Sequence, residues 1–211
     1  MNFNKILVLS PHTDDGEIGA GGTIARFVEE GKEIYYVAFS SCEVSVPKDF
    51  PEDILKKECK KATVILGIQN ENVILKDYEV RTFPLHRQEI LDDMIALNKQ
   101  IKPDLVLVPS SNDIHQDHQT IYKEALRAFK KTSSIWGYEH PWNNLTFTTD
   151  IFVRLEEKHV KKKIEAMKKY KSQDFRPYFD EKYIRALAYT RGAQVDYPFA
   201  EVFELLRLLV R

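Results

Sequence analysis

The chain has few of the features that mark disulfide-rich, membrane or nucleic-acid-binding proteins. It holds only two cysteines, Cys42 and Cys59, and no apolar run approaches the roughly 18 residues that a membrane span needs. The formal net charge is −1, so no global positive field would attract nucleic acid or an anionic membrane. The apolar run near the N-terminus is too short for a signal peptide. We therefore expect a reduced, cytoplasmic protein with no membrane span and no nucleic-acid partner.

Length and composition suit one globular domain over residues 1–211. Hydrophobic residues make up 43% of the chain and charged residues 30%, which is ordinary for a globular protein. A chain of 211 residues can bury a sizeable core. We find no internal repeat and no low-complexity segment that would divide it.

Short apolar runs alternate with amphipathic stretches in the first half of the chain. The predicted strands are residues 6–9, 34–39, 73–75 and 105–108. The predicted helices are residues 21–30 before Gly31, 52–66 before Gly67, 90–101 before Pro103, and 117–130. Two of the strands, 6–9 and 105–108, are apolar throughout, as expected when both faces of a strand are buried. This order predicts an α/β fold with three layers, a mostly parallel sheet between helices.

The second half of the chain departs from that alternation. Two strands are predicted at 135–138 and 146–153, and a helix at 155–171. A further helix near 180–190 and an apolar run over 202–210 follow. We therefore expect an additional C-terminal α+β portion.

Polar residues follow the first predicted strand directly. His12, Asp14 and Asp15 lie within four positions, and ligands of open α/β sheets bind at the carboxyl ends of strands. In one interpretation, one carboxylate binds a metal while its neighbour interacts with the metal-bound water. The alternative is an ordinary turn in which Asp14 or Asp15 caps the next helix. This segment alone leaves both interpretations open.

A second polar segment follows the strand at 105–108. Asp113, His115, Asp117 and His118 lie within six positions, and burying so many ionisable groups without partners would be costly. Asp117 is also a candidate helix N-cap, although that role would not explain both histidines.

The topology puts both polar segments at one edge of the sheet. Together they offer two histidines and a carboxylate, and three protein ligands with one open position are typical of catalytic zinc. Such ligands also accept Fe²⁺, Co²⁺ or Mn²⁺.

Glycines gather where the first helix is predicted to begin, at residues 19–22 (GAGG). Glycines at a helix N-terminus allow a phosphate to approach, but the spacing differs from that of dinucleotide-binding folds. Close packing of the helix against a strand is the simpler interpretation.

Two motifs resemble those of a known family. Residues 11–19 (PHTDDGEIG), followed by 21–23 (GGT), resemble the HPDDE signature of the PIG-L/LmbE-like N-deacetylases, and residues 115–118 (HQDH) resemble their HxDH motif. Thr13 stands in place of the usual proline and Gly16 in place of the first glutamate. Further similar segments are 136–139, 141–142, 170–173, 191–192 and 200–203. The resemblance runs from about residue 4 to residue 207.

The resemblance implies a Rossmann-like fold, a divalent metal that is usually zinc, and hydrolysis of an amide. By motif position it implies these metal ligands: His12, Asp15 and His118. Asp14 would be the general base. His115 would be the electrophilic or acid partner, with Asp117 positioning it.

The implied reaction is N-deacetylation of an N-acetylglucosamine-type sugar, a glycoconjugate or a related N-acyl amine. Members of the family often assemble, so the resemblance allows a homo-oligomer. A substrate-contacting arginine is common before residue 67, where this chain has Lys56 and Lys57. The aromatic residues Trp136, Tyr138 and Trp142 would either present faces to a sugar or belong to the core.

Two other functions fit parts of the pattern. A metal-dependent phosphoesterase would use the same ligands but typically needs a second metal about 3.5–4 Å away and further ligands. A sugar- or nucleotide-binding module without turnover would explain the α/β pattern and the glycines. That module would leave both polar segments unexplained.

Overall fold

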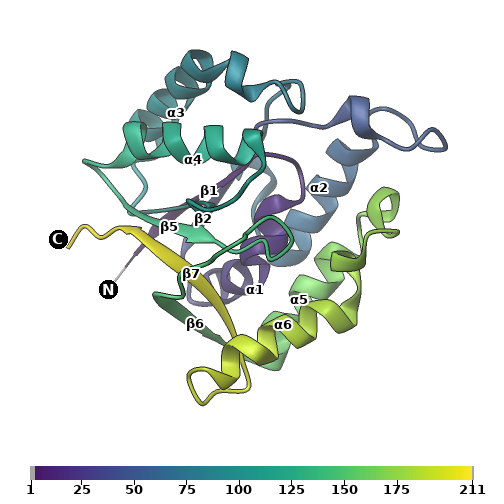
Figure 1. Cartoon of the computed structure of the whole chain (residues 1–211), viewed down its shortest axis with the longest axis vertical. Coiled ribbons are helices and arrows are strands. Elements are labelled where there is room, and N and C mark those ends of the chain that lie inside the picture. Colours follow the sequence, from purple (N-terminus) through teal and green to yellow (C-terminus); the bar gives the residue numbers. More distant parts are fainter. Residues whose placement is uncertain (1–2, 211) are drawn as a thin grey trace.

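Seven strands between residues 3 and 210, the part of the chain that this computed structural model describes, form one mixed sheet (Figure 1). Its order is β3-β2-β1-β4-β5-β7-β6. The parallel strands are β1 (Lys5–Ser10), β2 (Glu33–Ala38), β3 (Val73–Leu75), β4 (Leu105–Pro109) and β5 (Ser134–Tyr138). The antiparallel strands are β6 (Ile151–Leu155) and β7 (Phe199–Arg207), which extend the sheet beyond β5. The winding reverses between β1 and β4, and such reversals are where open α/β sheets bind ligands.

Helices cover both faces of the sheet, which confirms the three-layer prediction. One face carries α1 (Asp15–Glu29), α2 (Ile54–Leu66), α5 (Glu157–Met167) and α6 (Glu181–Ala193). The other carries α3 (Arg87–Ile101) and α4 (Gln116–Phe129). Strand β1 is apolar throughout because Ile6 and Val8 join the core under the first set, while Leu7 and Leu9 join the core under the second.

Helix α1 begins earlier than the sequence pattern predicts, at Asp15 rather than near Gly21. The glycines therefore lie inside the helix and not at its N-terminus, so the phosphate interpretation is wrong. A Cβ atom on Gly19 would overlap the ring of Tyr138 in β5, and one on Gly22 would lie 2.5 Å from Leu155 Cδ1 in β6. The missing side chains let α1 lie close to the sheet.

The C-terminal α+β portion is present, with changed boundaries. Strand β6 begins at Ile151, and residues 146–150 form no strand. Helix α5 ends at Met167, and a short 3-10 helix, η4 (Lys171–Gln173), follows it. The last apolar run belongs to β7, which starts at Phe199. Both strands join the main sheet, so this portion extends the same three layers.

A buried ion pair fastens α5 and β7 to α1. Lys163 Nζ donates to Ile18 O at 2.6 Å and to Glu201 Oε1 at 2.7 Å. Glu201 also accepts the backbone N–H groups of Gly22 and Thr23. Every polar atom of the pair therefore has a partner.

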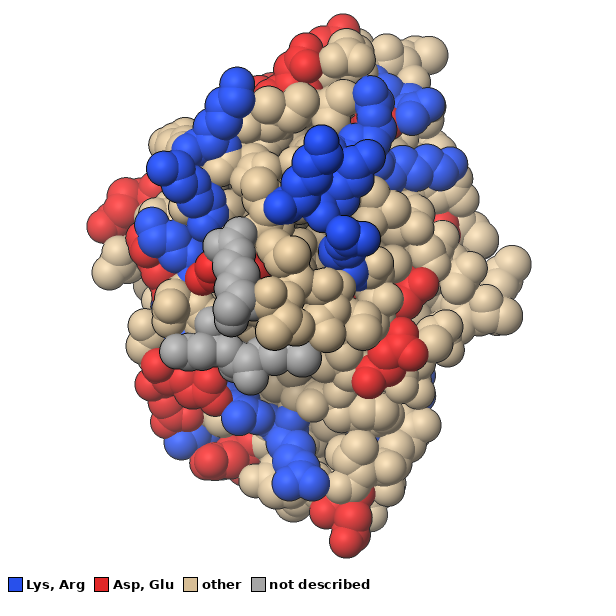
Figure 2. All heavy atoms as spheres, turned by 90° about the vertical axis from the view of Figure 1, so that its left-hand side faces the viewer, with Lys and Arg blue, Asp and Glu red and all other residues tan. Residues whose placement is uncertain are grey.

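The surface carries both charge signs. Figure 2 shows Lys and Arg gathered in the upper half of the face on the side of the chain termini, with Asp and Glu at its rim and in its lower half. No helix within residues 3–210 is long and apolar enough to cross a bilayer.

Candidate metal centre and active-site cleft

The two polar segments meet at the carboxyl ends of β1 and β4. These strands are hydrogen-bonded neighbours, with Val8 opposite Leu107, so the loops that follow them leave the sheet side by side. The first loop brings His12, Asp14 and Asp15, and α1 begins within it. The site therefore lies at the reversal point of the sheet, where the sequence pattern places it.

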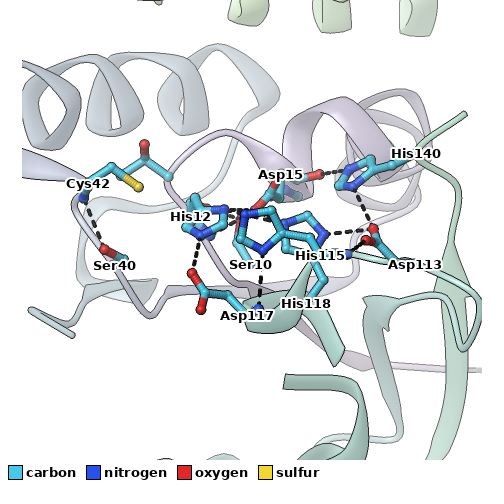
Figure 3. A network of polar contacts seen from close by, with 12 residues as sticks. Ser10, His12, Asp15, Ser40, Cys42, Asp113, His115, Asp117, His118 and His140 are labelled. Atoms are coloured by element: carbon cyan, nitrogen blue, oxygen red, sulfur yellow. Dashed lines mark hydrogen bonds and ion pairs between the residues drawn. The ribbon is translucent and has the colours of Figure 1, made fainter. Parts of the chain in front are cut away.

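Three side-chain atoms converge at the centre of this edge (Figure 3). His12 Nδ1 lies 2.9 Å from Asp15 Oδ2, and His118 Nε2 lies 3.2 Å from the same oxygen and 3.3 Å from His12 Nδ1. Tetrahedral zinc with bonds of about 2.0–2.1 Å separates its ligand atoms by about 3.3 Å. The triangle has the size and the donor types of three zinc ligands, with one position left open.

Each histidine of the triangle has a carboxylate on its other ring nitrogen. Asp113 Oδ2 lies 2.7 Å from His118 Nδ1, and Asp117 Oδ2 lies 3.0 Å from His12 Nε2. In Figure 3 these carboxylates flank the cluster from different sides. Carboxylates in this place fix the ring orientation and increase the basicity of a metal-binding imidazole. The triangle and its two supporting carboxylates therefore fit a divalent ion.

Asp117 contacts a different histidine from the one that the resemblance implies. Its carboxylate is fully buried and accepts the backbone N–H groups of Arg81 at 2.6 Å and Phe83 at 3.2 Å, besides bonding to His12. Only its backbone N–H reaches His115, donating to Nδ1 at 3.1 Å. The N-cap of α4 is therefore His115 rather than Asp117, and the carboxylate of Asp117 orients His12.

His115 lies beside the triangle and lines the cleft. Its ring centroid is 5.0 Å from that of His12 and 4.7 Å from that of His118. Because Nδ1 accepts a hydrogen bond, the neutral ring carries its proton on Nε2. Burial, followed by the charges of His118 and His12, lowers the pKa of His115 to about 4. The ring is thus a neutral hydrogen-bond donor.

His140 belongs to the same cluster, although the sequence analysis missed it. The residue is fully buried, and its Nε2 lies 3.1 Å from Asp15 O. Its Nδ1 is 3.5 Å from Asp113 Oδ2, and within the described chain it has no hydrogen-bond partner. A lone histidine after β5 gives little signal by itself. Its place at the end of the strand beside β4 is the signal that would have identified it.

The carboxylates of the cluster raise the pKa of both histidines of the triangle. Burial alone would lower the pKa of His12, but Asp15 and Asp117 raise it to about 10. Burial also opposes the charge on His118, whose pKa Asp15 and Asp113 raise to about 9. A bound dication would take the place of the protons on these two rings.

Asp14 stands apart from this network. It occupies the N-cap position of α1 but makes no side-chain cap, and it lines the cleft. Burial, followed by the negative charge of Asp15, raises the pKa of Asp14 to about 6. A nearby dication would act in the opposite direction. A carboxylate that is uncommitted beside a metal site is suited to accept a proton.

The cleft in front of the cluster has a volume of about 310 Å³, at the small end of the range for ligand sites. Of the three aromatic residues that could present faces to a sugar, Trp136 and Tyr138 are buried in the core. Trp142 lines the cleft, where its ring stacks with His140 at a centroid distance of 5.0 Å and with Tyr178 at 3.9 Å.

Lys56 and Lys57 do not line the cleft. Lys56 Nζ lies 2.8 Å from both Glu43 and Asp77, which satisfy its charge. Lys57 pairs with Asp53 on the surface. The arginines among the residues that line the cleft are Arg81 and Arg176.

Known proteins are similar to this chain in sequence and in fold. The relative named Uncharacterized deacetylase YaiS, from Escherichia coli K12, is 31% identical over 176 residues, which are 79% of this chain and 90% of the relative. The structure of N,N'-diacetylchitobiose deacetylase from Pyrococcus horikoshii matches with a TM-score of 0.80 at 22% identity, covering 97% of this chain and 84% of that one. GalB, the 4-carboxy-2-hydroxymuconate hydratase of Pseudomonas putida KT2440, matches with a TM-score of 0.79 at 20% identity, covering 99% and 98%.

These two structures support the fold alone, because one belongs to a deacetylase and the other to a hydratase. The comparison of sequences identifies the family. Residues 7–129, which include both polar segments, match the model of the PIG-L family, GlcNAc-PI de-N-acetylase. The chain therefore belongs to the PIG-L family.

Proposed function

We propose that the protein is a metal-dependent hydrolase that removes the acetyl group from an N-acetylglucosamine-type sugar or a related N-acyl amine. The observation that carries the proposal is the triangle of His12, Asp15 and His118, in which a carboxylate supports each histidine. Asp14, which makes no side-chain cap, lines the same cleft. The family description names an N-acetylglucosamine substrate, and the chitobiose deacetylase acts on an N-acetylated sugar.

His12 Nδ1, Asp15 Oδ2 and His118 Nε2 would hold the ion. Zn²⁺ suits two imidazoles and a carboxylate, and Fe²⁺, Co²⁺ or Mn²⁺ are alternatives for the same donors. A divalent ion in this position supplies an activated water and polarises the amide carbonyl.

Asp14 and His115 would handle the protons and the developing charge. The Asp14 carboxylate accepts a proton from the attacking water and delivers it to the nitrogen, so that the amine leaves neutral. His115 Nε2–H donates to the oxygen of the carbonyl as its charge develops. General acid–base help of this kind accelerates reactions by roughly 10²–10⁴-fold.

The first experiment measures metal content per chain by elemental analysis, together with acetate release from N-acetyl amino sugars. We expect about one ion in the wild type and almost none in His118→Ala. His86→Ala is the matched control, because His86 lies at the start of α3 and does not line the cleft. Asp14→Asn should keep the ion and lose most turnover.

Other outcomes would contradict parts of the proposal. Equal metal content in His118→Ala and the wild type would remove the ligand assignment. Full activity in Asp14→Asn would remove Asp14 as the base. Release of phosphate rather than acetate would favour a phosphoesterase. Among residues 3–210 the groups of potential metal ligands are His12 with His115 and His118, and Asp15 with His118 and His140. Both include His118, so they do not form two separate sites. Metal binding without any turnover would favour the binding module.

A further inference from the structure

Arg81 connects the metal centre to the cleft wall. Its backbone N–H donates to Asp117 Oδ2 at 2.6 Å, and its φ of 73° is a strained conformation for a residue with a side chain. Glycine would supply the same N–H without strain, so the contact with Asp117 does not explain an arginine. Arg81 is an exposed residue and is one of the residues that line the cleft.

Arg176 reaches the same cleft from the segment after η4. Its Nε donates to Gln173 Oε1 at 2.8 Å and its Nη1 to Tyr178 Oη at 2.9 Å. Its guanidinium carbon also lies 5.2 Å from the ring centroid of Phe175. These partners are all uncharged, so they hold the guanidinium in place while Nη2 and the positive charge stay available.

Five arginines within residues 3–210 form an ion pair with a glutamate: Arg26, Arg87, Arg127, Arg185 and Arg191. In the same part of the chain Arg154 and Arg207 form none, but they do not line the cleft. Within residues 3–210, neither guanidinium of the cleft has a carboxylate at ion-pair distance. These unneutralised charges lie where a substrate must bind.

Arg81 and Arg176 line the same cleft as Asp14, His115 and the proposed metal ligands. A substrate bound in this cleft for hydrolysis therefore lies near two cationic residues. Trp142 already stacks with two side chains of the protein, His140 and Tyr178.

We propose that the substrate carries a carboxylate or a phosphate, bound by Arg81 and Arg176, next to the part that holds the N-acyl group. The planar fork of a guanidinium matches the oxygens of either group. This inference rests on the proposed deacetylase function and names the class of its substrate. In this inference Arg81 and Arg176 determine the substrate specificity, and Lys56 and Lys57 do not contact the substrate.

The test measures binding without turnover. Calorimetry on the zinc-loaded protein compares glucosamine with glucosamine 1-phosphate, glucosamine 6-phosphate and muramic acid, which carries a carboxylate. We expect at least one anionic sugar to bind about 10- to 100-fold more tightly than glucosamine, the range for charge-assisted hydrogen bonds. Preference for a phosphate sugar or for muramic acid then identifies the anion.

Three variants locate the preference. Arg81→Gly keeps the backbone conformation and the N–H to Asp117, and Arg176→Gln keeps a polar side chain. Each should lose about tenfold or more of the preference while retaining zinc and the affinity for glucosamine. Arg154→Gln is the control, because Arg154 lies over Tyr197, away from the cleft, and should change nothing. Equal binding of neutral and anionic sugars by the wild type, or an unchanged preference in both cleft variants, would overturn the inference.

Acetate release from the N-acetylated forms of these sugars separates this inference from the proposed function. An anionic preference in binding without any acetate release would refute the deacetylase and leave the anion site standing. Acetate release at equal kcat/KM from neutral and anionic forms would refute the anion site and leave the deacetylase standing.

Discussion

Replacing Asp117 by asparagine separates two roles for this carboxylate. The family resemblance assigns it to positioning His115, whereas the structure bonds it to His12 Nε2. If Asp117 acts through His12, Asp117→Asn should weaken metal binding. If it acts through His115, the variant should keep its metal and lose turnover.

The expected magnitude follows from the contacts. Asp117 Oδ2 accepts from His12 and from Arg81 N, and Oδ1 accepts from Phe83 N. Asparagine has a single acceptor oxygen, which can keep the first two contacts, and its amide then faces the N–H of Phe83. The negative charge behind His12 is lost in either orientation. Loss of such a support typically lowers metal affinity by 10- to 100-fold, or about 1.4–2.7 kcal/mol.

The assay is a zinc titration in competition with a chromophoric chelator, with kcat measured at saturating zinc. We expect the affinity to fall by 10- to 100-fold while kcat falls much less. Asp93→Asn is the matched control. Asp93 lies on α3, where its carboxylate accepts hydrogen bonds from Lys76 and Tyr78, and this variant should leave the zinc affinity unchanged. Wild-type affinity combined with a large loss of kcat in Asp117→Asn would refute the role through His12.

Three further effects should be measurable. Zinc at 100 times its dissociation constant should stabilise the fold by about 2.7 kcal/mol, seen as a rise of Tm with zinc concentration, and a Tm that zinc does not change would contradict specific binding. Because the pKa values of His12 and His118 are raised to about 10 and 9 in the metal-free site, zinc binding at pH 7 must displace protons. The apparent affinity should therefore rise with pH up to about pH 10, and calorimetry in buffers of different ionisation enthalpy should detect proton release. Lys163→Met leaves the buried Glu201 without its cation and should cost about 3–5 kcal/mol in urea unfolding, whereas Lys162→Met on the exposed side of the same helix should cost little.

The sequence predicted the fold where burial leaves a simple pattern. Strands β1 and β4 are buried on both faces, so they read as continuous apolar runs, and Gly67 marks the end of α2 because its φ is 92°. The start of α1 was missed because glycine is a poor helix former. In this helix, contact with Tyr138 and Leu155 outweighs that propensity.

The candidate site was predictable as a set of residues but not as a network of contacts. The parallel sheet predicted from the runs puts both polar segments at one edge, but the pairing of β1 with β4, which brings His12 and His118 together, comes from the structure. The partner of Asp117 depends on the turn at Arg81, whose strained backbone has no signature in the sequence. His140 carries no motif of its own, and its role depends on Asp113, which it shares with His118.

The pairing of β1 with β4 has a consequence for the timing of metal binding. His12 and His118 are 106 positions apart, so the ligand triangle cannot exist until the long-range pairing of these strands has formed. Closing so long a loop is a late and slow event in folding. A metal that binds only after this step cannot guide the early folding of the chain. Its main kinetic effect is to slow unfolding and so to extend the lifetime of the native state.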